Sequence, residues 1–268
     1  MANQVYLNYI LKNEFEDQIN SHLDLMRFAT RDNSLVEEPG MTVKVRVYSA
    51  TDGVEKLEQG QGNTKSVETS YSDKDYTVLT AQGRFEYFDE EVKKDPLAIM
   101  KGNEHLAEDM FNTINADVYA ELLKATRTHT AASPDFAAFV RAAAMFKSER
   151  IRNERLFALV HPTDMAEARI ALENSIKYAD DFARDGYAEL VAGIELHEKA
   201  DAEEGTIVIA TKKAVTVFNK TGTEVEIITQ GNRSADDANR RKNTVFIRKY
   251  YIAALTDDTR AVKLALGG

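Results

Sequence analysis

Two alternating segments around a long polar stretch constrain this chain of 268 residues more than any other feature. Valines alternate with other side chains from Met41 to Ser49, and a second alternating segment runs from Tyr76 to Phe88. Because successive side chains of a strand point to opposite faces, both segments are predicted to be strands. The stretch between them, Thr51 to Asp75, carries few apolar side chains. We therefore predict a long hairpin with a polar tip that projects from the rest of the protein.

Such a hairpin needs a partner, because two strands alone are marginally stable in water. Compact domains rarely carry a loop of this length without a use for it, so we expect contacts outside its own domain to order it. The tip contains Gly60-Gln61-Gly62-Asn63. This cluster lacks the Lys-Ser/Thr pair and the strand-to-helix setting of a phosphate-binding loop, so we interpret it as a flexible tip.

The N-terminal residues predict a second segment that needs a partner. Apolar residues recur there at the three- and four-residue steps of a helix, at Leu11, Phe15, Ile19, Leu23 and Met26. A polar linker, Thr30 to Ser34, then leads to the turn pair Pro39-Gly40. A single apolar stripe cannot bury itself, so we expect an arm that docks either on its own domain or on a neighbouring chain.

Two helices are predicted in the middle of the chain. Asp95-Pro96 is typical of a helix start, and an apolar stripe runs from there to about Thr126. The stripe consists of Ile99, Leu106, Met110, Ile114, Val118 and Leu122. Ser133-Pro134 repeats the start signal and predicts a second helix that contains Phe136, Phe139, Val140 and Phe146.

The remaining residues predict an α+β fold with helices beside a mostly antiparallel sheet. Leu156 to Val160 reads as a buried strand, Thr163 as the cap of a helix, and Gly186 as the end of a short turn. Asn219 to Gly222 is a turn signal between two strands. The β-rich segments are Ile194 to His197, Thr206 to Ala210, Ala214 to Phe218, Thr223 to Thr229 and Thr244 to Leu255.

Composition excludes several classes of protein. The chain has no Cys, which excludes disulfides, thiolate metal sites and thiol nucleophiles. No apolar run approaches the roughly 20 residues of a membrane-spanning helix. The first residues, Met1 to Tyr6, lack the features of a signal peptide, so we expect the protein to be made inside a cell and to leave it only by lysis.

Catalytic motifs are missing as well. No Ser lies in a nucleophile elbow, and no His pair has a ligand spacing among His22, His105, His129, His161 and His197. Asn103-Glu104-His105 resembles the start of a helical zinc motif, but Asp109 stands where the second His would be. We predict no metal, no cofactor and no catalytic residue. An acid pair from Glu167, Glu173, Asp180, Asp181 or Asp185 would be needed for the enzymatic alternative, a cytosolic enzyme with a carboxylate-based site.

One segment departs from the overall net charge of −10. The segment from Gln230 to Ala254 contains six basic residues and only two acidic ones, Asp236 and Asp237. The basic residues are Arg233, Arg240, Arg241, Lys242, Arg248 and Lys249. A sequence-reading nucleic-acid site would have a basic domain with interleaved aromatic residues, which this chain lacks. We interpret the segment as one that pairs with acidic surfaces nearby, on this subunit or another, with nonspecific phosphate contact as the alternative.

The order of these parts resembles the major capsid proteins of tailed bacteriophages, whose fold is shared with encapsulin shells. The likeness covers nearly the whole chain and is one of pattern. It is carried by PGMTVKVRVYS (39–49), RFEYFDEEVKKDPLAIM (84–100), FALVHPTDMAEAR (157–169), KYADDFARDGYAELVAGIEL (177–196), IVIATKKAVTVFNKTGTEVE (207–226) and KYYIAALTDDTRAVKL (249–264).

The resemblance implies a structural protein that assembles into an icosahedral shell of pentamers and hexamers around double-stranded DNA. It implies a virion location after assembly in the host bacterial cytoplasm, a separate scaffolding protein, a portal, only nonspecific contact with DNA, and no membrane. An encapsulin-like compartment is the alternative on the same fold. Some members crosslink Lys to Asn, but Lys56, Lys65 and Lys74 in the polar loop are not taken to predict a crosslink.

The resemblance also implies a division of the chain. Residues 1–40 would form the N-terminal arm and residues 41–90 the extended hairpin loop. Residues 91–130 would form a peripheral domain around a long spine helix that the chain approaches as a strand through EEVKKDP. Residues 131–268 would form the axial domain and the C-terminal return to the peripheral domain.

Overall fold

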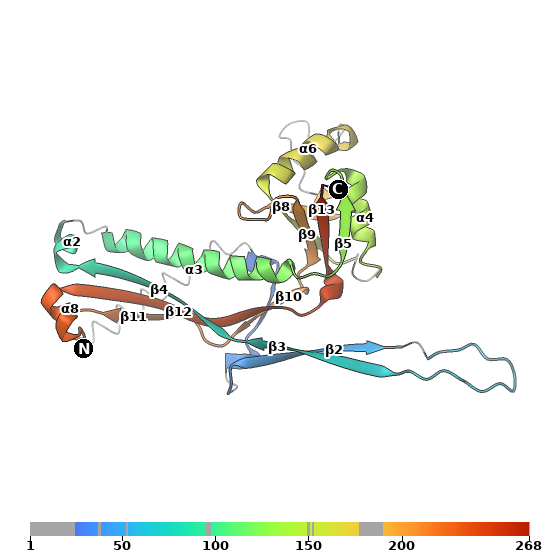
Figure 1. Ribbon diagram of the computed structural model, residues 1–268, viewed down its shortest axis with the longest axis horizontal. Coiled ribbons are helices and arrows are strands. Elements are labelled where there is room, and N and C mark those ends of the chain that lie inside the picture. Colours follow the sequence, from blue (N-terminus) through green and yellow to red (C-terminus); the bar gives the residue numbers. More distant parts are fainter. Residues whose placement is uncertain are drawn as a thin grey trace.

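A computed structural model describes residues 25–36, 39–51, 53–94, 98–148, 151, 153–176 and 190–267. Figure 1 shows an elongated part built on one long helix, a compact part above one end of it, and a hairpin that extends beyond both. The predicted α+β class is confirmed. None of the helices in these residues has a stretch long and apolar enough to cross a membrane.

The long helix is α3, Ala98–Leu122, which has 25 residues and a length of about 37 Å at 1.5 Å per residue. Its predicted stripe is confirmed from Leu106 to Leu122, because every member between them is buried in one core. The expected start at Asp95-Pro96 lies outside the described residues. Gly102 lets the helix approach strand β4 closely, since a Cβ there would lie 2.3 Å from the ring of Phe85.

A short helix, α2 (Asp89–Lys94), precedes α3 where we expected a strand to continue. That expectation was wrong. All three residues of the first turn are acidic, which favours a helix start. The Glu91 carboxylate also accepts a hydrogen bond from the Phe88 backbone N–H, at 3.0 Å, so the strand ends at Phe88.

A five-stranded sheet lies under α3. Its central strand is β12, Lys242–Leu255. Strand β4 pairs along one edge of β12, while β10 and β11 pair with successive parts of it and so follow each other along the other edge. The bounds are β1 Thr30–Asp32, β4 Leu79–Phe88, β10 Val215–Asn219 and β11 Glu224–Ile228.

Strand β1 is a correction to the predicted polar linker, which includes it. Its three residues pair in parallel with β10 at the edge of this sheet. Backbone pairing, together with a hydrogen bond from the Thr30 hydroxyl to the Lys212 carbonyl at 3.1 Å, holds this edge strand, so its side chains can stay polar.

The compact part is built on a six-stranded sheet of order β5-β13-β9-β6-β8-β7. Helices α4 (Phe136–Ala144) and α6 (Pro162–Ile176) share a core with one of its faces. The other face shares a core with α3 and with Leu25 and Met26. The bounds are β5 Thr128–Ala131, β6 Leu156–Val160, β7 Leu190–Val191, β8 Ile194–Glu198, β9 Thr206–Thr211 and β13 Ala261–Leu266.

Most predicted elements of this half are confirmed, and the helix starts are corrected. The cap of α4 is Asp135 rather than Ser133, because its carboxylate accepts the Ala138 N–H at 2.7 Å. Thr163 lies inside α6, which begins at Pro162. The turn at Gly186 lies outside the described residues, as does the arm stripe except for Met26.

The hairpin consists of β2 (Thr42–Ala50) and β3 (Thr69–Thr77). The predicted return strand, Tyr76 to Phe88, is therefore wrong in its pairing. The chain changes partners at Val78, whose N–H donates to the Met41 carbonyl at 2.6 Å, and from Leu79 onward it pairs with β12. Residues of the predicted polar tip form β3 because their charges pair across the hairpin, as Arg46 and Asp73 do at 2.7 Å.

Strands of the C-terminal half belong to both parts of the molecule. The last strand, β13, lies between β5 and β9 in the compact part. The passage to the elongated part is made earlier, by β10, β11 and β12. The reason is the length of β12, whose 14 residues run along the elongated part before the chain turns back.

Candidate assembly surfaces

The hairpin has one charged face and one apolar face. On the charged face Arg46 pairs with Asp73 and its guanidinium also lies over the ring of Tyr71, 4.4 Å from the centroid. The Arg46 hydrogen bond lowers the pKa of Asp73. The opposite face carries Val43, Val45 and Val47, because strand residues alternate. Val47 is 42% exposed and Val43 and Val45 are half-buried, so the described residues cover this valine face only in part.

The tip beyond the strands also presents apolar side chains to solvent. Val54 is 90% exposed and Val67 58% exposed. The loop is organised by its own hydrogen bonds, since the Glu55 carboxylate accepts the Thr64 N–H at 3.0 Å. Gly60-Gln61-Gly62-Asn63 lies in this loop, as predicted, with Gly60 at a positive φ of 91°. A polar loop that holds several exposed apolar side chains is suited to contact another surface.

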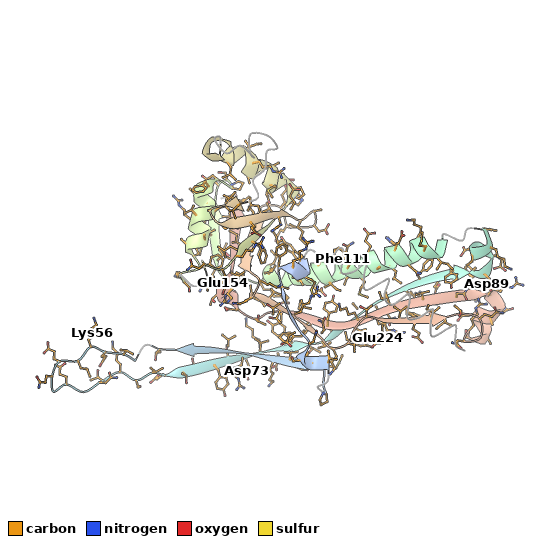
Figure 2. The ribbon with its side chains drawn as sticks, turned by 180° about the vertical axis from the view of Figure 1, so that it is seen from behind. Lys56, Asp73, Asp89, Phe111, Glu154 and Glu224 are labelled. Carbon is orange, nitrogen blue, oxygen red and sulfur yellow. The ribbon has the colours of Figure 1, made fainter. Side chains whose placement is uncertain are left out.

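The base of the hairpin is fastened to the elongated part. The Tyr76 hydroxyl donates to the carbonyl of Leu255, the last residue of β12, at 3.3 Å. Burial raises the pKa of this tyrosine, and the nearby Glu121 carboxylate adds to the shift. The hydroxyl therefore stays protonated and able to donate. Figure 2 shows Lys56 at the tip and Asp89 at opposite ends of the molecule.

The opposite end of the elongated part is held by charge pairs between α2 and the segment around α8 (Ala235–Arg240). Arg233 donates to both carboxylate oxygens of Asp89, at 3.0 and 2.5 Å, and Asn243 donates to one of them at 2.8 Å. Arg241 donates to Glu90 at 2.7 Å. We call these five residues the distal clamp.

The structure shows on which subunit the basic segment, Gln230 to Ala254, finds its acidic partners. Four bases of the basic segment pair with acids of β4, α2 or β11 in the same chain. The pairs are Arg233 with Asp89, Arg241 with Glu90, Lys242 with Glu86, and Arg248 with Glu226. Arg240 pairs with Asp236 within α8. The acidic surface that the basic segment was expected to find lies on the same subunit for these five residues.

Electrostatics in the clamp favour the ionised carboxylates. Hydrogen bonds from Arg233, then from Asn243, lower the pKa of Asp89. A bond from its own backbone N–H, then one from Arg241, lowers the pKa of Glu90. The Ser234 hydroxyl and the Lys242 ammonium do the same for Asp237. These carboxylates therefore stay charged at pH values at which an ordinary acidic side chain already takes up a proton.

Among the comparisons with known proteins, the one with solved structures identifies a fold. No protein-family model and no curated protein sequence matches the chain. Among solved structures, the capsid of a native GTA particle matches with a TM-score of 0.69 and 12% identity, over 92% of this chain and 91% of that one. The capsid of the cyanophage P-SCSP1u matches with a TM-score of 0.65 and 11% identity, over 90% and 87%.

The chain has the fold of bacteriophage capsid proteins. The virus-like particle from Pyrococcus furiosus shares this capsid fold, with a TM-score of 0.64 and 11% identity over 96% of this chain and 99% of that one. The resemblance stated from the sequence is thereby confirmed at the level of the fold.

The described residues do not gather the side chains that we considered as ligands into a metal site. The described residues contain no group of three His, Asp or Glu side chains that could hold a metal ion. His105 and Asp109 are both exposed on α3, and Glu167 is exposed on α6. The side chain of Glu173 and the residues Asp180, Asp181 and Asp185 lie outside the description.

Two of the described histidines, His161 and His197, make local contacts. His161 accepts the Thr163 N–H at 3.2 Å, before α6. The His197 ring lies 4.6 Å from that of Phe28, which in turn lies 4.5 Å from Phe157. His129 belongs to β5. His22 lies outside the described residues.

Sequence reasoning missed the acidic half of the distal clamp. Asp89 and Glu90 stand beside a predicted strand with nothing to mark them among 44 acidic residues. The basic half was visible as a local excess of charge. Only the pairing of β4 with β12 in the capsid fold, which places Phe88 opposite Lys242, brings the two halves together.

Proposed function

We propose that this protein is the major capsid protein of a tailed bacteriophage, a coat subunit that assembles into an icosahedral shell around double-stranded DNA. The projecting hairpin is the observation that carries the proposal. It has an exposed valine in Val47, exposed apolar side chains in its tip, and a hydrogen bond that fastens its base to β12. A two-stranded element of this kind gains stability when another surface covers it.

Identical subunits provide such a surface without any other protein. In a symmetric assembly each subunit offers the same hairpin and receives the same hairpin, so a single contact type repeats around the shell. The fold of the chain supports this view, because the capsid structures that it matches are those of assembled particles. The role is structural, without a catalytic step or a cofactor.

The parts of the chain would divide the work of assembly. The arm, residues 1–40, and the hairpin loop, residues 41–90, would reach neighbouring subunits. The spine helix region, residues 91–130, would form the periphery together with β10, β11 and β12. The compact part, drawn from residues 131–268, would meet its copies around the five-fold and six-fold axes.

The charge of the chain is consistent with a container that holds DNA loosely. The net charge is −10, and five bases of the one basic segment are paired within the subunit. Contact with packaged DNA would therefore be nonspecific. A separate scaffolding protein and a portal would complete assembly in the bacterial cytoplasm, and the mature subunit would reside in the virion.

Expression of the full chain, alone and with its scaffolding protein, tests the proposal directly. Analytical ultracentrifugation and negative-stain electron microscopy should detect closed shells of uniform size. A monodisperse monomer of about 30 kDa under every condition would overturn it.

A compartment that encloses protein cargo is the second candidate. It rests on the likeness of the fold to the Pyrococcus furiosus virus-like particle, matched over 99% of that chain, whereas the matches to phage capsids favour the first candidate. The contents of shells purified from the native host separate the two. Nuclease-protected double-stranded DNA supports the phage capsid, whereas a stoichiometric protein cargo without DNA supports the compartment.

A further inference from the structure

Helix α4 is almost entirely apolar, which is unusual for a helix on the surface of a subunit. Its sequence, FAAFVRAAA, contains one charged residue, Arg141. Ala138, Phe139 and Ala142 are buried against the compact part. A helix that is hydrophobic all round is normally buried all round, so its outer face is expected to have a cover.

The outer face of α4 forms a defined patch. Phe136 is 46% exposed and Val140 is 42% exposed. These two residues are four positions apart and so lie one above the other on the same side of the helix. Arg141 is exposed next to Val140. The patch therefore combines two apolar side chains with one positive charge.

Helix α6 carries a patch of the opposite charge. Ile170 is 72% exposed. Glu167 and Ala166, three and four positions before it, are also exposed and lie on the same side of the helix. None of the ion pairs found between described residues involves Arg141 or Glu167. Figure 1 shows α4 along one side of the compact part and α6 across its top, so the two patches belong to different helices.

We infer that the outer face of α4 binds the α6 patch of a second copy of this chain, in a head-to-tail contact that rests on the proposed shell function. Phe136 and Val140 would pack around Ile170, and Arg141 would pair with Glu167. Charge complementarity selects this arrangement, since two α4 faces in contact would place one Arg141 against another. A contact between two different patches repeats from copy to copy and closes into a ring when the rotation between copies allows it, as pentamers and hexamers require.

Crosslinking between two single-cysteine variants tests the contact. The chain has no Cys, so each added thiol is unique. Arg141→Cys and Glu167→Cys subunits are assembled separately and as a mixture, then treated with a short bismaleimide. A dimer band that forms only in the mixture supports the contact, because any link between the two positions must then join two chains. Its absence in shells that do form overturns the inference and leaves the shell function intact.

Charge reversal tests the pairing by a second route. Arg141→Glu and Glu167→Arg should each reduce the yield of shells, and the double variant should restore it. Single variants that assemble normally, or a double variant that does no better than the singles, would contradict the pair. If the unaltered chain forms no shells at all, the failure belongs to the proposed function instead.

Substitution of an apolar residue distinguishes two possible covers of the outer face of α4. One is a second copy of the chain, and the other is a segment of the same chain. Val140→Ser should lower the shell yield about tenfold, because one buried valine contributes roughly that factor to association. Met100→Ser is the matched control, since Met100 on α3 has the same exposed fraction of 42%. The melting temperature of the unassembled Val140→Ser subunit should match that of the control variant. A clear loss of subunit stability would show that the chain covers α4 itself and would overturn the inference.

Discussion

Arg233 binds both carboxylate oxygens of Asp89, at 3.0 and 2.5 Å, although 144 residues separate them in the chain. The pair joins the loop before α8 to the start of α2, and Asn243 of β12 donates to the same carboxylate at 2.8 Å. Bidentate pairs of arginine with a carboxylate fix orientation as well as distance. The end of the elongated part that lies farthest from the hairpin tip is thereby held in one geometry.

Removal of the Arg233 side chain should weaken this end of the subunit. We expect Arg233→Ala to lower the melting temperature by about 2–4 °C, because Asp89 and Asn243 lose a shared partner. Arg240→Ala is the matched control, since Arg240 makes an exposed pair with Asp236 in the same segment at 3.4 Å. Exposed pairs of that kind contribute little to stability, so the control should stay within about 1 °C. Equal losses in both variants would contradict the distal clamp.

Acid should destabilise the subunit through the clamp carboxylates. The pKa values of Asp89, Glu90 and Asp237 are all lowered in the folded state. The unfolded chain therefore takes up protons at a higher pH than the folded chain. The stabilisation is fully present above the ordinary carboxyl pKa and is lost as the pH falls through the lowered folded values.

Thermal unfolding of the unassembled subunit between pH 7 and pH 3 measures this loss. Asp89→Asn, which cannot ionise, should be less stable at pH 7 and should show a shallower fall toward acid. If the melting temperature of the variant falls with pH as steeply as that of the unaltered chain, Asp89 does not contribute to the acid destabilisation.

The hairpin should be dispensable for folding and essential for shells. Val45 and Lys74 are opposite each other in the strand pair, so residues 46–73 can be replaced by an Asn-Gly turn at that point. The shortened subunit should melt within a few degrees of the full chain, because the two cores contain no residue of the removed segment. It should form no closed particles in the electron microscope. Particles like those of the full chain would refute the proposed role of the hairpin.

The core beneath the spine helix should not accept a charge. Leu122 is 1% exposed, and Leu122→Asp would bury a carboxylate without a partner. We expect the variant to unfold or aggregate, with a loss above about 4 kcal/mol. Ala120→Asp is the control, because Ala120 lies on the exposed side of the same helix. A soluble Leu122→Asp protein with an unchanged melting temperature would contradict the helix register.

The elements with strong periodic patterns could be predicted from the sequence. The stripe from Leu106 to Leu122 and the wholly apolar strand Leu156–Val160 leave one way to bury their side chains, so local sequence decides their structure. Pairing between distant segments was not predictable in the same way. Residues 69–75 read as part of the polar tip and residues 76–88 as one strand, and nothing local shows that the chain pairs with β2 up to Thr77 and with β12 from Leu79.

The same distinction applies to the candidate surfaces: one was predictable from local sequence and two were not. The hairpin was predicted because an exposed two-stranded element leaves a local signature of alternation and polarity. The α4 face was not, because Phe136 and Val140 look like core residues until the structure shows which side of the helix is buried. The distal clamp required knowledge of the β4 and β12 register, which a single sequence does not contain.

Val78 is the only residue between β3 and β4, and these strands belong to different sheets. The backbone at this one position therefore sets the direction in which the hairpin leaves the subunit. Strand β3 has nine residues, or about 30 Å of length, so a turn of only 10° at Val78 would carry its far end roughly 5 Å sideways. In the proposed shell, a small angular difference at this junction would let the hairpin follow a different curvature.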